Sequence, residues 1–342
     1  MVLDSDLKND YVWCMSIEII SFYKFIPFTS DKVNELEDRL KSLATDLDDR
    51  QSCPLSVRGL TILGTEGINA TYSVDKKIAE EFKRELCKIF ALDNLPFKLS
   101  WADKHAFHDF KIKVRKEIVT LERPDLVPTG TENHASPDEW HRMMKNDDPV
   151  VIDTRNSYEY EIGHFKGALN PQIEEFSEFP GWLKKMDLPK DKKVLIYCTG
   201  GIRCEKAILE MQEQGFSDVH QLDGGIIKYL EAFKESQPES LYDGECFVFD
   251  YRVAVDHDLN PTQKYKLCPH CGQPAACQID CVQCGRTDVV CDTCLTKGET
   301  EAGSRLKNQY HTCSKNCAHH FRMGHKTERV HHDAFNRRVI SG

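Results

Sequence analysis

Residues 197–204, "YCTGGIRC", combine residue types that favour thiol chemistry. The apolar run "KVLIY" before Cys198 is typical of a buried strand, so this cysteine stands at a strand end. Gly200 and Gly201 allow backbone N–H groups to turn inward, and a helix expected to begin near Arg203 adds its positive end. Helix N-termini lower the pKa of a cysteine from about 8.5 to about 3.5–7.5. We therefore interpret Cys198 as a reactive thiolate, since a buried structural cysteine would explain neither the glycines nor the arginine.

Four closely spaced cysteine pairs, "CPHC", "CVQC", "CDTC" and "CSKNC", lie between residues 268 and 317. Two thiolates at such a spacing can chelate one tetrahedral Zn²⁺, and four complete a structural site. The sequence therefore predicts two structural zinc sites and leaves open whether neighbouring or alternate pairs combine. The expected metal ligands are Cys268, Cys271, Cys281, Cys284, Cys291, Cys294, Cys313 and Cys317.

Other metal chemistry is less well supported by this pattern. An iron–sulfur cluster also uses four thiolates, but paired CxxC sequences favour zinc. A catalytic zinc ion is disfavoured because four cysteine ligands leave no open coordination position. Cys277 is left over, with His270 and His311 as candidate substitute ligands. Few large apolar residues follow Glu239, so metal is expected to supply the folding energy that a sparse core lacks.

Composition bounds the number of domains and the compartment. The 342 residues, of which 40% are apolar, suit two or three domains with real cores. No apolar run approaches the ~18 residues of a membrane span, and residues 1–10 lack the features of a secretion signal. We therefore expect a cytoplasmic protein with no membrane partner. In that reducing compartment a dense cysteine cluster indicates metal ligands rather than disulfides.

Charge points to local rather than global contact with a nucleic acid. The net charge of −10 argues against binding through the overall field, whereas residues 303–342 carry eight Lys or Arg against two acidic residues. This asymmetry predicts a basic end facing an acidic partner such as RNA, with a solvated extension as the alternative. The stretch "KHAFHDFKIKVRK" (104–116) suits phosphate contact and base stacking, or is a basic edge strand kept soluble by its charges. Its candidate RNA-binding residues are Lys111, Lys113 and Arg115.

Three regions are expected to position these residues. Residues 16–121 show the element order βαββαβ, which predicts a ferredoxin-like sandwich. After a linker rich in Pro and Gly, residues 130–238 alternate helices with short apolar strands, which predicts a doubly wound α/β domain. Ligands of such sheets bind at the carboxyl ends of the strands, where Cys198 falls. Residues 239–342 are expected to form the cysteine-rich region and the basic tail.

Three segments, "VVIDTRNSYEYEIGHFKGALN", "LIYCTGGIRCEKA" and "LDGGIIKYL", resemble the signatures of a rhodanese domain. The resemblance implies that Cys198 carries sulfur as a persulfide. Related phosphatases use a loop one residue longer, so the loop length here favours sulfur chemistry over phosphate-ester hydrolysis. The loop residues between Cys198 and Arg203 are Thr199, Gly200, Gly201 and Ile202.

The same resemblance implies supporting roles. Asp153 and Arg155 match the strand-end signature and are expected to brace the site by ion pairing. Cys204 belongs to the loop signature and lies about one helical turn past the loop, so it is either a resolving thiol for Cys198 or a helix cysteine packed against the sheet. Residues that match a turn signature and are expected to be structural are Gly163, His164 and Gly167.

The order of four features resembles one family more closely, namely the rhodanese-domain-containing tRNA uridine hydroxylases. These features are "GTEGINAT" (64–71), "FKIKVRKEIVTL" (110–121), "YCTGGIRCEKA" (197–207) and the cysteine-rich segment. The resemblance covers roughly residues 16–317. It implies an oxidoreductase of the monooxygenase type that uses O2 as co-substrate and forms 5-hydroxyuridine at wobble uridine 34, with the anticodon loop of tRNA as partner.

From the resemblance we also expect a sulfur donor or an electron donor as a partner. No flavin or haem is expected, because the sequence has no pattern for either, and we hypothesise that a persulfide or sulfenate of Cys198 takes part. Two alternatives use the same cysteine: a rhodanese-type sulfurtransferase, and a zinc-stabilised, redox-sensing RNA-binding module. A simple sulfurtransferase needs neither the ferredoxin-like domain nor the zinc region, and a sensor would not need the whole glycine-lined loop.

Overall fold

The computed structural model describes residues 17–51, 56–130, 133–300 and 308–324. It divides into two compact units between Pro261 and Thr262. No helix within the described ranges is long and apolar enough to cross a membrane. Most of the expected basic tail, residues 303–307 and 325–342, lies outside the described residues.

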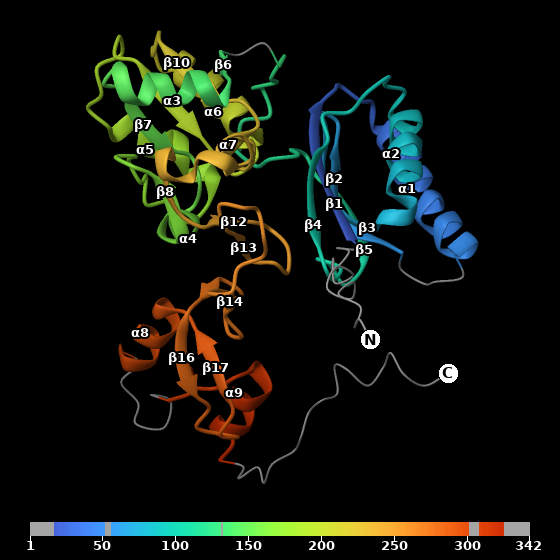
Figure 1. Cartoon of the computed structure of the whole chain (residues 1–342), viewed down its shortest axis with the longest axis vertical. Helices are drawn as coiled ribbons and strands as arrows, with labels where there is room; N and C mark the ends of the chain where they lie inside the picture. The colour runs from blue at the N-terminus through green and yellow to red at the C-terminus, as the bar shows by residue number, and fades with distance from the viewer. Residues whose placement is uncertain (1–16, 52–55, 131–132, 301–307, 325–342) are drawn as a thin grey trace, which may run out of the picture. The chain divides into compact units, whose positions relative to one another are not determined.

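The first unit begins with a five-stranded sheet that carries two helices on one face (Figure 1). Its elements are β1 (Ile17–Phe25), α1 (Ser30–Gln51), β2 (Val57–Gly64), β3 (Gly67–Asp75), α2 (Lys76–Phe90), β4 (Lys98–Ala102) and β5 (Phe110–Val114). The strand order is β4-β1-β3-β2-β5, and the first four strands are antiparallel to their neighbours. This is the sheet of a βαββαβ sandwich, so the predicted ferredoxin-like fold is confirmed. The fifth strand, β5, is an additional edge strand parallel to β2.

Alternating burial gives this sheet one apolar face beneath α1 and α2. Along β2, buried and half-buried positions alternate from Val57 to Leu63, as period-two side-chain direction requires. The opposite face carries a row of cross-strand partners, in which the register pairs Tyr23 with Asn69, Asn69 with Ile62, and Ile62 with Lys113. Directly paired residues share a face, so these four side chains lie on the face away from the helices.

A parallel sheet with helices on both faces follows. Its elements are β6 (His134–Ala135), α3 (Pro137–Asn146), β7 (Val150–Asp153), α4 (Ser157–Ile162), β8 (Gly163–Phe165), η1 (Phe176–Glu178), α5 (Phe179–Lys185), β9 (Val194–Tyr197), α6 (Ile202–Glu213), β10 (Val219–Leu222), α7 (Gly225–Ala232) and η2 (Lys234–Glu239). The sheet order is β6-β10-β9-β7 with parallel pairing throughout. Ile152 and Ile196 pack against α5 and α6, whereas Leu195 and Tyr197 pack against α3 and α7. The doubly wound prediction is therefore confirmed.

Residues 240–261 belong to the first unit, although the sequence places the start of the cysteine-rich region at residue 239. They contain β11 (Tyr242–Gly244), β12 (Cys246–Phe247) and β13 (Ala254–Val255). Strand β11 pairs antiparallel with β8, and Tyr242 and Val255 join the core of the parallel sheet. The strands here are two or three residues long, too short for hydrophobic periodicity to detect them.

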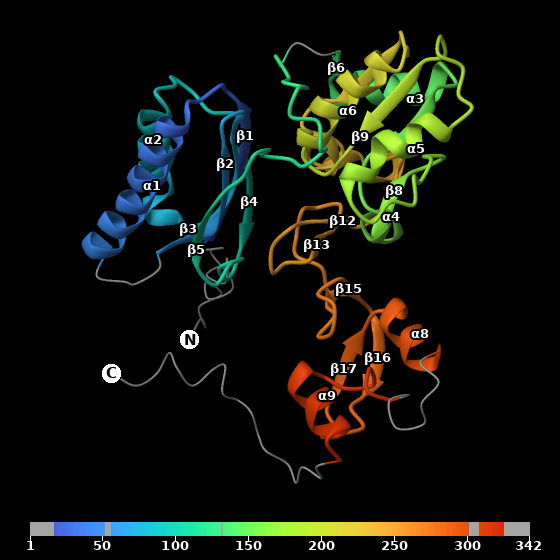
Figure 2. The same ribbon diagram turned by 180° about the vertical axis from the view of Figure 1, so that it is seen from behind.

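The second unit is small and built around a β-hairpin. Its elements are β14 (Lys266–Leu267), β15 (Pro274–Ala275), β16 (Cys277–Asp280), β17 (Thr287–Val290), α8 (Asp292–Thr300) and α9 (Lys315–Arg322). The two hairpin strands lie between α8 and α9 in both views (Figures 1 and 2). Its apolar core holds Ala275, Ile279 and Val290 together with three cysteines, which is little for an independent unit.

Candidate active site and metal centres

The cysteine loop joins the end of β9 to the start of α6. The backbone N–H of Gly201 donates to Sγ of Cys198 at 3.0 Å, and Gly201 adopts φ +101°, a left-handed conformation that favours glycine. The backbone N–H of Ile226 donates to the carbonyl oxygen of Cys198 at 3.0 Å. This contact requires Gly225, because a Cβ there would lie 2.6 Å from the carbonyl oxygens of Cys198 and Thr199. The glycines of the loop and of "LDGG" therefore let backbone amides reach the loop.

The surroundings of Cys198 favour the thiolate. Burial alone would raise the pKa of Cys198, but the Cys204 thiol, the charge of Arg203 and the backbone N–H groups of Arg203 and Cys204 lower it to about 5. Burial and the neighbouring Cys198 sulfur raise the pKa of Cys204, so Cys204 remains a thiol that donates to the anion. Cys204 also packs within the core of the parallel sheet, as the second of the two alternatives requires, and its role as a resolving thiol stays a prediction.

Arg203 holds the loop by means of a buried carboxylate. Its guanidinium donates to both carboxylate oxygens of Glu159, at 2.6 and 2.8 Å, and the Thr199 hydroxyl donates to the same carboxylate at 3.2 Å. Glu159 is fully buried, and the Arg203 charge holds the pKa of this carboxyl below its usual range against the effect of burial. The pair keeps the Arg203 charge beside Cys198. Glu159 is a functional residue that no sequence motif indicates.

Asp153 and Arg155 brace the ends of the strands, away from the cavity. Both are fully buried, and they pair with each other at 2.6 Å. The guanidinium of Arg155 also donates to the carbonyl oxygen of Gly163 at 2.6 Å, which fixes the turn between α4 and β8. His164 in that turn lies 3.0 Å from the carbonyl oxygen of Tyr160.

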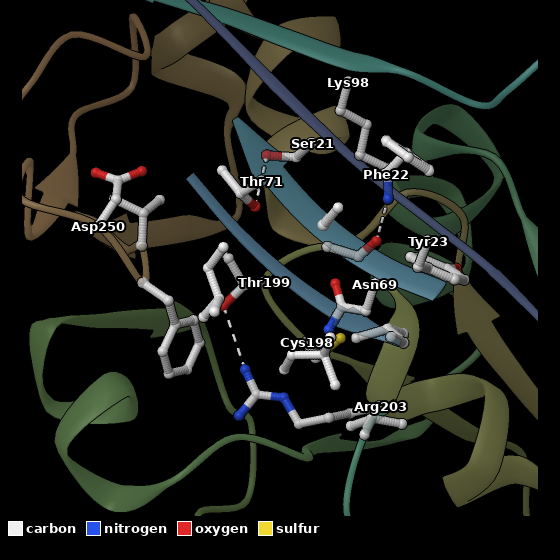
Figure 3. A pocket seen from close by; sticks show the side chains of 18 of the residues that line it. Ser21, Phe22, Tyr23, Asn69, Thr71, Lys98, Cys198, Thr199, Arg203 and Asp250 are labelled. Atoms are coloured by element: carbon white, nitrogen blue, oxygen red, sulfur yellow. Dashed lines mark hydrogen bonds between the residues drawn. The ribbon is translucent and has the colours of Figure 1, made fainter. Parts of the chain in front are cut away.

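A cavity of about 610 Å³ adjoins the loop, and Cys198 lines it (Figure 3). The Cys198 side chain is fully buried, so its sulfur lies beneath the surface of the cavity. The volume falls in the range of small-molecule pockets, about 300–1,000 Å³, and leaves room for a pyrimidine. Its walls come from the helix-free face of the first sheet, from the cysteine loop and from residues 248–259. Among the lining residues are Tyr23, Ile62, Asn69, Lys98, Arg115, Ile118, Cys198, Thr199, Gly200, Ile202, Arg203 and Phe249.

The first sheet adds two residues to the site that no sequence motif indicates. The Lys98 ammonium donates to the carbonyl oxygen of Gly200 and lies 4.8 Å from the centre of the Tyr23 ring. Burial lowers the pKa of Lys98 to about 8, against the effect of the Cys198 charge, which raises it. The Tyr23 hydroxyl donates to Glu205 at 2.9 Å. Lys98 on β4 therefore contacts the cysteine loop, and Tyr23 on β1 contacts the helix that follows it.

The basic stretch predicted to contact RNA, residues 104–116, contains β5, and its three candidate residues lie on β5 or directly after it. Lys111 lies opposite Leu60, and Lys113 lies opposite Ile62, so both share the sheet face that lines the cavity. Both are exposed, and Lys111 pairs with Asp109 at 2.9 Å. Arg115 is exposed and lines the cavity itself. The stretch is thus a basic edge strand whose charges border the cavity.

Three of the sequence motifs meet in one buried ion cluster. Lys206, near the end of "YCTGGIRCEKA", is fully buried and lies 2.7 Å from Glu66 and 2.6 Å from Glu117. Glu66 comes from "GTEGINAT", and Glu117 comes from "FKIKVRKEIVTL"; both are buried. The Glu66 carboxylate also accepts the backbone N–H of Ile118 at 2.6 Å. The cluster fastens the first sheet to α6, the helix that carries the cysteine loop.

Replacing Lys206 by methionine is expected to lower the free energy of unfolding of the first unit by about 3–5 kcal/mol. The substitution leaves two carboxylates buried without a counter-charge, which is the costly way to break a buried ion pair. Urea unfolding of the full chain, followed by tryptophan fluorescence, measures the loss. The matched control is Lys192→Met, because Lys192 makes an exposed pair with Asp148 at 3.4 Å and such pairs contribute about 0–1 kcal/mol. Equal losses for the two variants would contradict the role of the cluster.

The eight paired cysteines form two sets of four thiols in the second unit. One set is Cys268, Cys271, Cys291 and Cys294, and the other is Cys281, Cys284, Cys313 and Cys317. The sulfur atoms of each set all lie within 4.8 Å of one another. The pairing is interleaved, because the first pair along the chain combines with the third and the second with the fourth.

Both sets fit a tetrahedral metal ion. A Zn–S bond of about 2.3 Å requires sulfur–sulfur edges of about 3.8 Å. The observed distances include 3.5 Å for Cys271–Cys291, 3.5 Å for Cys284–Cys313 and 3.7 Å for Cys313–Cys317. The second unit can therefore hold two metal ions with four cysteine ligands each.

The leftover Cys277 and the two candidate substitute ligands, His270 and His311, lie outside these two sets. The Cys277 thiol donates to Asp292 at 2.8 Å, and the His270 ring lies 3.1 Å from the carbonyl oxygen of Tyr310. His311 joins neither set, although its Nδ1 is buried and has no partner among the described residues. The sets are complete with cysteine alone.

Two family models match the first unit. A UPF0176 acylphosphatase-like domain matches residues 17–118, and a rhodanese-like domain matches residues 136–232. The fold and the cysteine loop thus define a rhodanese-like protein, with an acylphosphatase-like domain before the rhodanese-like domain and a cysteine-rich unit after it that could hold metal.

Curated relatives cover most of the chain. The chain is 44% identical to tRNA uridine(34) hydroxylase of Bdellovibrio bacteriovorus, over 88% of this chain and 82% of that protein. It is 42% identical to the protein of the same name from Legionella pneumophila, over 71% of this chain and 92% of that protein. The chain is 39% identical to the protein of the same name from Synechocystis, over 81% of this chain and 99% of that protein. The chain belongs to the tRNA uridine(34) hydroxylase family.

Proposed function

We propose that this protein hydroxylates uridine 34 of tRNA at carbon 5 and forms 5-hydroxyuridine. The observation that carries the proposal is the cavity in which the Cys198 thiolate faces a wall from the acylphosphatase-like domain. That cavity has the volume for one pyrimidine. The names of the relatives supply the substrate and the position, and their identity extends over both domains that build the cavity.

The proposed reaction is an oxygen-dependent monooxygenation. One atom of O2 replaces the hydrogen at carbon 5 as a hydroxyl group, the other leaves as water, and a donor supplies a pair of electrons. We hypothesise that a persulfide or sulfenate of Cys198 takes part, since a thiolate with a pKa of about 5 is the reactive form at neutral pH. Arg203, the Cys204 thiol and the loop amides stabilise the sulfur anion. Thr199 bonds to Glu159 beside Arg203, and Asp153 with Arg155 braces the strands behind the loop.

The RNA is proposed to approach along β5. Lys111, Lys113 and Arg115 border the cavity and suit contact with the phosphates of the anticodon loop. Uridine 34 must leave the stack to enter the cavity, and a single-stranded loop permits this at a cost of a few kcal/mol.

The two cysteine sets are proposed to hold structural zinc. We propose the cytoplasm as the compartment, because tRNA is found there.

The direct test uses purified protein and tRNA transcripts that lack modification. After incubation in air with a dithiol reductant, nucleoside mass spectrometry should detect 5-hydroxyuridine, and cleavage mapping should place it at position 34. Incubation under isotopically labelled O2 should transfer the label to the new hydroxyl group. The proposal fails if a deletion strain of the source organism retains all its 5-hydroxyuridine at this position.

A rhodanese-type sulfurtransferase is the second candidate, and the match of residues 136–232 to a rhodanese-like domain favours it. The two candidates differ in their requirement for RNA. A sulfurtransferase would move sulfur from thiosulfate to cyanide at a rate that tRNA does not affect. It would leave uridine 34 unmodified in the assay above.

A further inference from the structure

The motif "GTEGINAT" places one amide side chain in the cavity. Asn69 is the third residue of β3, opposite Tyr23 of β1 and Ile62 of β2, so it shares their face of the sheet. Asn69 and Cys198 line the same cavity (Figure 3). Tyr23 links the two, because a Cβ on Gly201 of the loop would lie 2.8 Å from the Tyr23 hydroxyl. Asn69 is thus the cross-strand neighbour of Tyr23, which contacts the loop.

The hydrogen bonds of Asn69 fix the direction of its amide. Its Nδ2 donates to the carbonyl oxygen of Ile118 at 3.2 Å, and only the nitrogen end can make that bond, so the orientation follows from the network. The amide keeps one N–H and the whole of Oδ1 for a ligand. Oδ1 has no hydrogen-bond partner within the part of the chain that the structure describes.

Nearby polar groups on this face are already used. The hydroxyls of Ser21 and Thr71 bond to each other at 3.1 Å. Thr199 and Arg203 are engaged with Glu159. Asn69 therefore offers an adjacent donor and acceptor to a flat ligand in a cavity that the apolar residues Ile62 and Ile118 also line.

We propose that Asn69 recognises the uracil base, with Oδ1 accepting the proton of N3 and the free N–H of Nδ2 donating to the neighbouring carbonyl oxygen. The inference rests on the proposed function, because it takes the base in the cavity to be uridine 34. It explains a motif residue that neither the metal centres nor the cysteine loop require. Carbon 5 adjoins carbon 4, so fixing this edge of the ring also fixes the atom to be hydroxylated.

The fixed amide distinguishes uracil from cytosine. N3 of uracil carries a proton, whereas N3 of cytosine is an acceptor, so cytosine in the same place sets two acceptors against each other. Turning the amide over would break the bond to Ile118. A good bidentate contact gives about 1–3 kcal/mol of discrimination, which corresponds to about 5–150-fold in affinity.

The test measures binding of anticodon stem-loop RNAs to the full chain without oxygen, so that no turnover occurs. The RNAs carry uridine, cytidine or 3-methyluridine at position 34. The wild-type chain should bind the uridine RNA about 10–100-fold more tightly than the other two. In Asn69→Ala these ratios should fall to within about threefold of unity. The matched control is Asn133→Ala, because Asn133 makes the same type of bond, from Nδ2 to the carbonyl oxygen of Val219 at 3.0 Å, outside the cavity lining.

Two outcomes would overturn the inference. One is equal binding of the three RNAs by the wild-type chain, which needs no variant and so is independent of whether Asn69→Ala folds. The other is a uridine preference that persists in a folded Asn69→Ala chain. Hydroxylation by the wild-type chain, assayed in parallel in air, separates the two claims. Lost preference in the variant without hydroxylation by the wild type would support base recognition and reject the proposed reaction.

Discussion

Replacing Cys198 by serine is expected to abolish 5-hydroxyuridine formation, with a fall of about 10³-fold or more in turnover. Serine fills the same space and can accept the Gly201 amide, but its hydroxyl does not ionise near neutral pH. The variant therefore keeps the loop and loses the anion that its surroundings stabilise. Nucleoside mass spectrometry of tRNA transcripts after incubation with each variant measures the effect.

The control for Cys198→Ser is Cys87→Ser. Cys87 lies half-buried on α2 against the core of the first sheet, away from the cavity lining, and its loss should leave turnover within about twofold. Thermal unfolding should show that both variants remain folded. If the Cys198→Ser protein formed as much 5-hydroxyuridine as the wild type, the thiolate would have no part in the reaction.

Replacing Cys294 by serine is expected to unfold the second unit. Cys294 is a buried member of the first cysteine set, and the apolar core around it is small. Structural zinc contributes about 10–16 kcal/mol of apparent binding free energy in small domains, which this core cannot replace. Elemental analysis should find a fall from two zinc ions per chain to one or fewer, and limited proteolysis should cut within residues 262–324.

Cys277→Ser is the matched control for this second prediction. Cys277 lies in the same unit, but its thiol bonds to Asp292 and belongs to neither set. Its metal content and protease resistance should equal those of the wild type. Well under one zinc ion per wild-type chain, with no iron, would contradict the assignment of both sets.

The local parts of the site could be predicted from the sequence. An apolar strand, a glycine pair and a helix start are consecutive in residues 193–204, so their geometry follows from neighbouring residues. The pairs of metal ligands are equally local, because two cysteines separated by two or three residues must lie together. The order βαββαβ likewise restricts the sheet to few topologies.

The long-range parts could not be predicted. Lys98 and Tyr23 reach the loop because one face of the first sheet packs against α6, and no local pattern in β4 or β1 records that contact. The same holds for the ion cluster of Lys206, which lies 89 residues after Glu117, the nearer of its two partners in the sequence. The interleaving of the cysteine pairs also depends on the path of the hairpin between them rather than on their spacing.

The central claim is that the loop holds Cys198 as an anion at neutral pH. The measurement is the ultraviolet absorbance of the thiolate as a function of pH, taken as the difference between the wild type and Cys198→Ser so that the other cysteines cancel. A group whose pKa is lowered is anionic above that value, so the difference signal should appear as the pH rises through about 5 and stay constant to neutral pH. A midpoint near 9, the ordinary value for a cysteine, would contradict the account.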